Sequence, residues 1–176
     1  MIFFLIGCGS KTIDSSDRFK SYCSSLSNVS LPLKISCGFD SGTIDTSGFN
    51  KFKDFIPSKM DRIYGFLSCK DSTTLILYGQ TGDDIYPYLY SYDFNGKIQD
   101  SLFLIINPCG AADDKVIPHS YALIDKDLQI NLIDTSRFIT YTDNMNYSVD
   151  SILISEKLYK LDHNGYFNMI KENSKR

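Results

Sequence analysis

The chain of 176 residues contains no tryptophan and only two histidines, His119 and His163. None of its five cysteines is spaced as Cys-x-x-Cys, so the usual zinc and redox motifs are missing. There is also no P-loop, no Gly-x-Gly-x-x-Gly, no His-Glu-x-x-His and no Gly-x-Ser-x-Gly. The sequence therefore predicts a protein that is not an enzyme and that holds neither a cofactor nor a metal.

Excess positive charge and long apolar runs are lacking as well. The net charge is −3 and the Lys and Arg residues are scattered, so nucleic acid is not an expected partner. No stretch reaches the roughly 20 apolar residues that a membrane-spanning helix needs.

Aromatic residues are abundant, with 12 Tyr and 12 Phe. Such residues suit the half-buried surface of a sheet. Strands are expected at 63–68, 73–78, 85–92, 97–106, 118–124, 128–134, 138–141, 151–161 and 166–170. Most connections have two to five residues, which predicts antiparallel hairpins in a meander because parallel crossovers need a dozen or more. The predicted fold class is mainly β.

One hairpin pattern occurs three times, at 93–96, at 162–165 and more loosely at 125–128. Units of about 35 residues suggest propeller-blade-like hairpins or a partial barrel. The pattern Asp-x-Asn-Gly also resembles the start of a calcium loop, but neither glycine at position 6 nor glutamate at position 12 follows it. Asp and Asn that bond their own backbone, and Gly with positive φ, favour simple turns.

One or two short helices are expected before the strands. Residues 17–26 have apolar side chains on one helical face, with Asp14, Ser15 or Ser16 as cap. A second helix is expected from Ser47 to Ile56 and ends before Pro57. Its phenylalanines would cover a face of the sheet, or else form a wedge for a partner.

The first eight residues are apolar and end in Leu5-Ile6-Gly7-Cys8. This sequence matches the lipobox of bacterial lipoproteins, in which the cysteine is lipidated and becomes the first mature residue. The domains would be a signal at 1–8, a tether or short helix at 9–28 and a single β-rich domain at 29–176. Because no basic residue precedes Cys8, either the start is placed too late or the segment belongs to the fold.

The chain resembles small cell-envelope lipoproteins common in the Bacteroidetes. The residues that carry the resemblance are the lipobox, Leu31-Pro32-Leu33, the segment 88–102 and the closing hairpin 161–167. The resemblance implies a lipid-anchored, mostly β protein in the cell envelope, at the outer membrane, with its periplasmic or surface side left open. It implies a binding or structural role and transfers no catalytic residue.

Four tyrosines, Tyr86, Tyr88, Tyr90 and Tyr92, alternate along one expected strand and so share one face. Tyrosines fill sheets, and they also stack on ligands. The stripe is therefore either packing or a surface for a protein, peptide or glycan partner.

Two other functions stay open. A hydrolase could use His119 with Ser120 and the acidic loops at 83–84 and 113–114. A soluble immunity-type binding module would instead place residues 1–8 in the fold. Two disulfides or buried thiols are both compatible with the other cysteines, Cys23, Cys37, Cys69 and Cys109.

Overall fold

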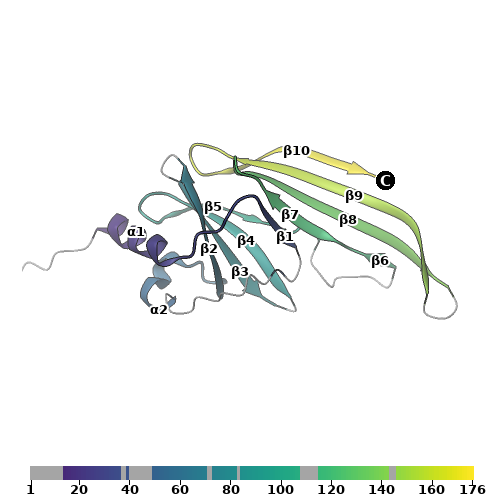
Figure 1. The fold of residues 1–176 in the computed structure, drawn as a ribbon, viewed down its shortest axis with the longest axis horizontal. Coiled ribbons are helices and arrows are strands. Elements are labelled where there is room, and N and C mark those ends of the chain that lie inside the picture. Colours follow the sequence, from purple (N-terminus) through teal and green to yellow (C-terminus); the bar gives the residue numbers. More distant parts are fainter. Residues whose placement is uncertain are drawn as a thin grey trace, which may run out of the picture.

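The fold is mainly β, as the sequence predicts, with strands in 58% of the described residues (Figure 1). The computed structural model describes residues 14–36, 39, 49–70, 73–82, 84–107, 115–142 and 146–176, without the side chains of 49, 50 and 68–70. The helices are α1 (Ser15–Ser25), α2 (Phe49–Phe52) and the 3-10 helix η1 (Lys53–Phe55). The strands are β1 (Leu33–Ser36), β2 (Arg62–Lys70), β3 (Thr73–Thr81), β4 (Ile85–Tyr92), β5 (Ile98–Phe103), β6 (Val116–Ile117), β7 (Ser120–Ile124), β8 (Gln129–Tyr141), β9 (Tyr147–Leu161) and β10 (Phe167–Lys175).

These strands form two separate sheets. One has the order β2-β3-β4-β5, and the other has the order β1-β7-β8-β9-β10 with β6 also paired to β8. All pairs between these strands are antiparallel and most join neighbours in the chain, which confirms the meander. The strands lie in two antiparallel sheets, and neither closes into a barrel.

Strand β8 corrects the prediction of two strands at 128–134 and 138–141. The polar residues Thr135, Ser136 and Arg137 lie between the two expected strands, but they pair without interruption with β9. Strand β9 also begins at Tyr147, four residues earlier than expected. Backbone pairing to a long neighbouring strand thus outweighs the local polar composition.

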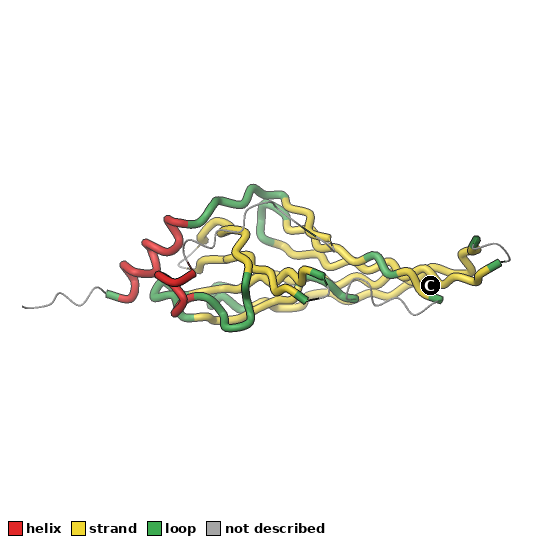
Figure 2. Tube along the Cα trace, turned by 90° about the horizontal axis from the view of Figure 1, so that it is seen from below, coloured by secondary structure: helices red, strands yellow, loops and turns green. Residues whose placement is uncertain are grey.

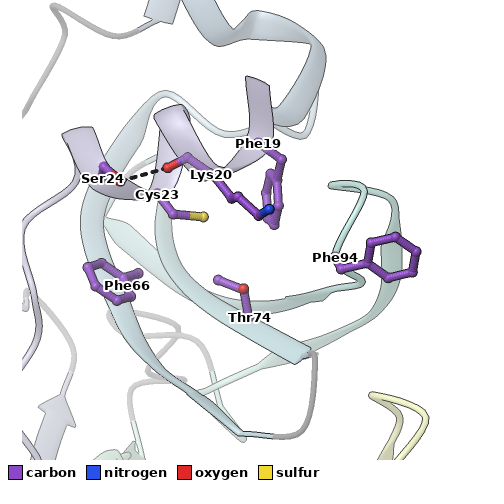
Figure 3. A pocket seen from close by; sticks show the side chains of 7 residues that line it. All are labelled: Phe19, Lys20, Cys23, Ser24, Phe66, Thr74 and Phe94. Carbon is purple, nitrogen blue, oxygen red and sulfur yellow. Dashed lines mark hydrogen bonds between the residues drawn. The ribbon is translucent and has the colours of Figure 1, made fainter. Parts of the chain in front are cut away.

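The helices cover one face of the four-stranded sheet (Figure 3). The Asp14 side chain accepts a hydrogen bond from the Ser16 N–H group at 3.4 Å, and it caps α1 as expected. Tyr22 on α1 and Phe55 on η1 are buried with sheet residues Ile76 and Tyr78. The second helical segment therefore covers the sheet, as one of its two predicted roles requires.

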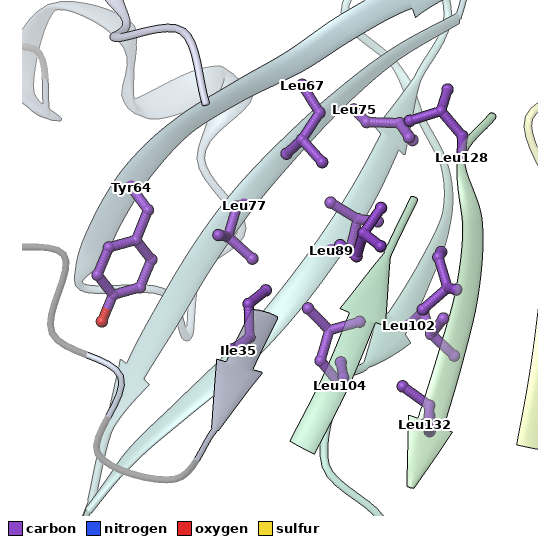
Figure 4. Packing of buried hydrophobic residues seen from close by; sticks show 13 residues of the cluster. Ile35, Tyr64, Leu67, Leu75, Leu77, Leu89, Leu102, Leu104, Leu128 and Leu132 are labelled. Carbon is purple, nitrogen blue, oxygen red and sulfur yellow. The ribbon is translucent and has the colours of Figure 1, made fainter. Parts of the chain in front are cut away.

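The main core lies between the two sheets (Figure 4). Leucines from the four-stranded sheet meet Ala122, Ile124 and Ile130 from β7 and β8. Short β1 pairs only with β7 and places Ile35 in this core. The order of layers is thus helices, four-stranded sheet and six-stranded sheet.

All three predicted turns have the same architecture. In each, an aspartate Oδ1 accepts hydrogen bonds from the backbone N–H groups two and four residues further on, at 2.8–3.0 Å, for Asp93, Asp125 and Asp162. The fourth residue has positive φ in every turn and is Gly96, Leu128 or Gly165. The repeated hairpin is a device that fixes strand register.

Strands β8 and β9 extend beyond the sandwich as a long ribbon, which β6 borders at Arg137 and Phe138 (Figures 1 and 2). Both views place α1 at one end of the molecule and the ribbon tip at the other. The fold therefore separates the N-terminal helix from the exposed end of the six-stranded sheet.

Candidate binding surfaces

The predicted tyrosine stripe divides into a buried part and a half-buried part. Tyr92 is fully buried beneath the helices and donates a hydrogen bond to the Phe55 carbonyl at 2.8 Å. Since its proton is used there, the Tyr78 hydroxyl donates to Tyr92 at 2.9 Å, and Tyr22 donates to Tyr78 at 2.8 Å. Burial is the main reason why the pKa values of Tyr78 and Tyr92 lie above the ordinary value. Tyr92 is thus a core residue and not a ligand residue.

The other three tyrosines of the stripe are partly exposed. Tyr88 contacts the ring of Phe103 on β5 with a centroid distance of 4.9 Å, and Tyr86 and Tyr90 lie beside this pair. Burial raises the pKa of the Tyr90 phenol, and the neighbouring Tyr88 adds to the rise. The half of the stripe away from the helices remains available as an aromatic surface.

Within the described residues, His119 and Ser120 do not face a common site. His119 is exposed and contacts the Tyr121 ring, while Ser120 is buried and points to the opposite face of β7. The Ser120 hydroxyl donates to Asp134. Of the acidic loops, only Asp84 is described, and its carboxylate accepts from the Ile85 N–H group.

Asp134 is a buried carboxylate whose partners are all neutral. It accepts hydrogen bonds from the hydroxyls of Ser120 and Ser136 and from the Asn107 amide. These hydrogen bonds join β7, β8 and the segment that follows β5, so the cluster has a structural role.

Within the described ranges, no three His, Cys, Asp or Glu residues are grouped to hold a metal ion. Backbone hydrogen bonds, first the one from Tyr166, lower the pKa of Asp162. Its carboxylate is therefore engaged in the turn, in line with the turn interpretation of the sequence.

The largest group of exposed apolar side chains lies on the outer face of the ribbon. We call it the ribbon face, and its members are 44–57% exposed: Tyr141, Tyr147, Val149, Ile152 and Ile154. The strand register places them on one side, because they are Tyr141 itself or residues paired with positions 135, 137, 139 and 141 of β8, although Ile139 on this side is only 4% exposed.

Basic residues flank the ribbon face. Arg137 pairs with Ile152, and Lys175 on β10 pairs with Ile154, so both project from the same side. Further toward the sandwich, a hydrogen bond from Asn131 is the main cause that lowers the pKa of Glu156, with Lys171 and Lys175 adding to it. The surface is apolar at the tip and charged toward the sandwich.

Sequence reasoning missed the ribbon face, although part of its signal was visible. Tyr147 and Val149 alternate, as do Ile152 and Ile154, but a bulge between them shifts the period. Without pairing partners, the sequence could not show that the two halves share a face.

Some predicted residues lie outside the described part of the chain. These are Cys8 with the rest of the lipobox, Cys37, Cys109, Asp83, Asp113, Asp114, Ser47 and the side chain of Cys69. Among the described helices, none has the length and apolar character needed to cross a membrane. Comparisons of the chain with protein-family models, curated proteins and solved structures find no match.

Proposed function

We propose that this chain is a lipid-anchored cell-envelope protein whose β domain presents the ribbon face to another protein. The lipobox Leu5-Ile6-Gly7-Cys8 supports the anchor. The ribbon face is the observation that supports binding, since contiguous exposed apolar side chains mark interaction sites.

The shape of the molecule suits such a role. Only five residues lie between Cys8 and Asp14, so the six Cα–Cα steps from Cys8 to Asp14 span at most roughly 22 Å when extended. An anchor there holds the α1 end near the membrane and directs the ribbon tip away from it. The ribbon face then lies where a partner can approach.

The side chains of the ribbon face offer enough apolar surface for specific binding. Full burial of one large apolar side chain contributes about 1.5–3 kcal/mol, and each of these five is about half exposed. Tyr141 and Tyr147 add rings that are common at the centres of interfaces. Arg137 and Lys175 favour a partner with acidic residues around its apolar centre.

The half-exposed tyrosines form a second and smaller surface on a different sheet. Tyr86, Tyr88 and Tyr90 with Phe103 suit a peptide or glycan that stacks on rings. This surface would provide a second contact, and the proposal does not depend on it.

Membrane fractionation of Cys8→Ala tests the anchor. We expect the variant to leave the membrane fraction, whereas the matched Cys23→Ala variant stays, because Cys23 is on α1 within the folded domain. A Cys8→Ala protein that remains with the membrane as wild type does would contradict the anchor.

Photo-crosslinking in intact cells tests the ribbon face. A photoreactive residue at Ile152 or Ile154 should give one discrete adduct with a protein, while the same group at Leu153 should not, since Leu153 points to the other face. An adduct with a second copy of the chain would indicate a structural role by self-assembly. Equal labelling from all three positions would refute the proposal for this face.

A further inference from the structure

An open apolar cavity of about 380 Å³ lies between α1 and the four-stranded sheet (Figure 3). Its size falls within the range of about 300–1,000 Å³ that small-molecule sites occupy. Seven residues line it: Phe19, Lys20, Cys23, Ser24, Phe66, Thr74 and Phe94.

The lining is mostly apolar and comes from four parts of the fold, one of which is β3 with Thr74. Phe19 and Cys23 project from α1, Phe66 from β2 and Phe94 from the turn after β4. Phe94 is 61% exposed, which is a large exposure for a phenylalanine. Its ring points away from the other lining side chains in Figure 3, so a ligand chain would meet Phe94 at the rim of the cavity and gain from the apolar contact there.

Only one lining residue carries a charge. Lys20 extends from α1 beside the Phe19 ring, and its ammonium is 3.9 Å from the Asp17 carboxylate. Both side chains are about 70% exposed (73% and 68%), so water weakens this ion pair. The nearby Ser24 hydroxyl donates to the Lys20 carbonyl within the helix at 2.8 Å. The mouth of the cavity therefore offers a single exposed cation above an apolar wall.

We propose that this cavity binds an amphiphile with an alkyl chain and one carboxylate, such as a medium-chain fatty acid. The chain lies against Phe19, Phe66 and Phe94, and the carboxylate pairs with Lys20. The complementary charge selects the anion over a neutral or cationic head group. The site is on the other sheet from the ribbon face and does not depend on the anchor.

The absence of tryptophan from the chain makes the test direct. Phe94→Trp places the sole indole at the cavity, and Tyr166→Trp places it in the exposed turn before β10, outside the cavity lining, as a control. Decanoate, decanol and decyltrimethylammonium, each below its micelle concentration, share one chain and differ in charge. We expect saturable fluorescence changes from Phe94→Trp alone, with decanoate the tightest and the cation the weakest.

Charge variants then locate the carboxylate. Lys20→Gln should weaken decanoate binding roughly threefold to fivefold, in keeping with an exposed ion pair, and leave decanol unchanged. Asp17→Asn should strengthen decanoate binding, because Lys20 loses its competing partner. A blocking variant, Ser24→Leu, should weaken all three ligands relative to Ser24→Ala.

Three outcomes would overturn the inference: no saturable change from Phe94→Trp, an equal response from Tyr166→Trp, or equal affinity for decanoate and the cation. None of them would bear on the Cys8 fractionation or on crosslinking from the ribbon.

Discussion

The hydroxyl groups of Tyr78 and Tyr92 lie 2.9 Å apart in the core beneath the helices, in a chain that ends on the Phe55 carbonyl. Burial is the largest cause that raises the pKa of each phenol. Ionisation of either one would place a charge among apolar side chains and remove a hydrogen-bond donor. The pair therefore couples the stability of the helix-covered face to alkaline pH.

We expect the free energy of unfolding to fall as the pH rises above about 10. Below that pH, these phenols are protonated in both states and contribute no pH dependence. Above it, the unfolded chain releases their protons while the folded chain keeps them, so each tyrosine lowers stability by about 1.4 kcal/mol per pH unit. The loss continues until the pH reaches the raised pKa of the folded state.

Urea unfolding of wild type, Tyr78→Phe and Tyr92→Phe at pH 9, 10 and 11 measures this effect. Each single variant should show a smaller decrease in stability with pH than wild type, and the exposed Tyr166 provides a Tyr→Phe control outside the core. An unchanged slope in the Tyr78→Phe and Tyr92→Phe double variant would disprove the coupling.

Gly96 and Gly165 occupy the same position in two copies of the turn, with φ of 80° and 87°. A Cβ atom at Gly96 would lie 2.6 Å from the rings of Phe19 and Phe55, whereas at Gly165 the nearest atoms are 3.4 Å away. We expect Gly165→Ala to cost about 1 kcal/mol for the backbone alone. Gly96→Ala should cost about 2–4 kcal/mol, since packing strain is added. Equal losses in urea unfolding would show that the Gly96 turn does not pack on the helices.

Leu128 takes the glycine position in the third turn, with φ of 61°, and it is only 4% exposed. Its buried side chain compensates for a backbone conformation that L-residues rarely adopt. Leu128→Ala removes most of the buried side chain and keeps the strained backbone conformation. Leu128→Gly removes the whole side chain but relieves the backbone strain.

We therefore expect Leu128→Gly to be more stable than Leu128→Ala by about 1 kcal/mol, the reverse of the usual order. Both should be less stable than wild type by about 2–4 kcal/mol. Urea midpoints measure the difference, and a more stable Leu128→Ala protein would contradict the role of φ.

The sequence predicts the three turns, α1 and the first and last residues of β4, because interactions between residues close together in the chain determine them. Asp93 and Asp162 bond N–H groups within four residues, so no distant partner is needed. The sequence does not predict the division into two sheets, since this division depends on which hairpins pack face to face. The same limit explains why Tyr92 was grouped with Tyr86, Tyr88 and Tyr90: alternation gives the face, but only the position of the helices shows which part of it is covered.

Asp134 is the clearest case of a residue whose role required the structure. Asp134 is the last residue of the strand expected at 128–134, and the structure shows that it is 1% exposed and that its carboxylate accepts from Ser120, Ser136 and Asn107. No ion pair to Asp134 appears among the residues that the structure describes. The three donors therefore provide the hydrogen bonds that the buried carboxylate needs.

Replacement of Asp134 should reveal how much those donors matter. Asp134→Asn keeps one carbonyl oxygen for Asn107, and the two hydroxyls can rotate, so we expect a loss of about 1–2 kcal/mol. Asp134→Leu leaves all three donors without an acceptor and should cost more than about 3 kcal/mol. Ser136→Ala, which removes one donor and leaves the carboxylate with two, should cost about 1 kcal/mol. Urea unfolding gives all three values. An Asp134→Leu protein as stable as Asp134→Asn would show that packing, and not hydrogen bonding, determines the contribution of this cluster to stability.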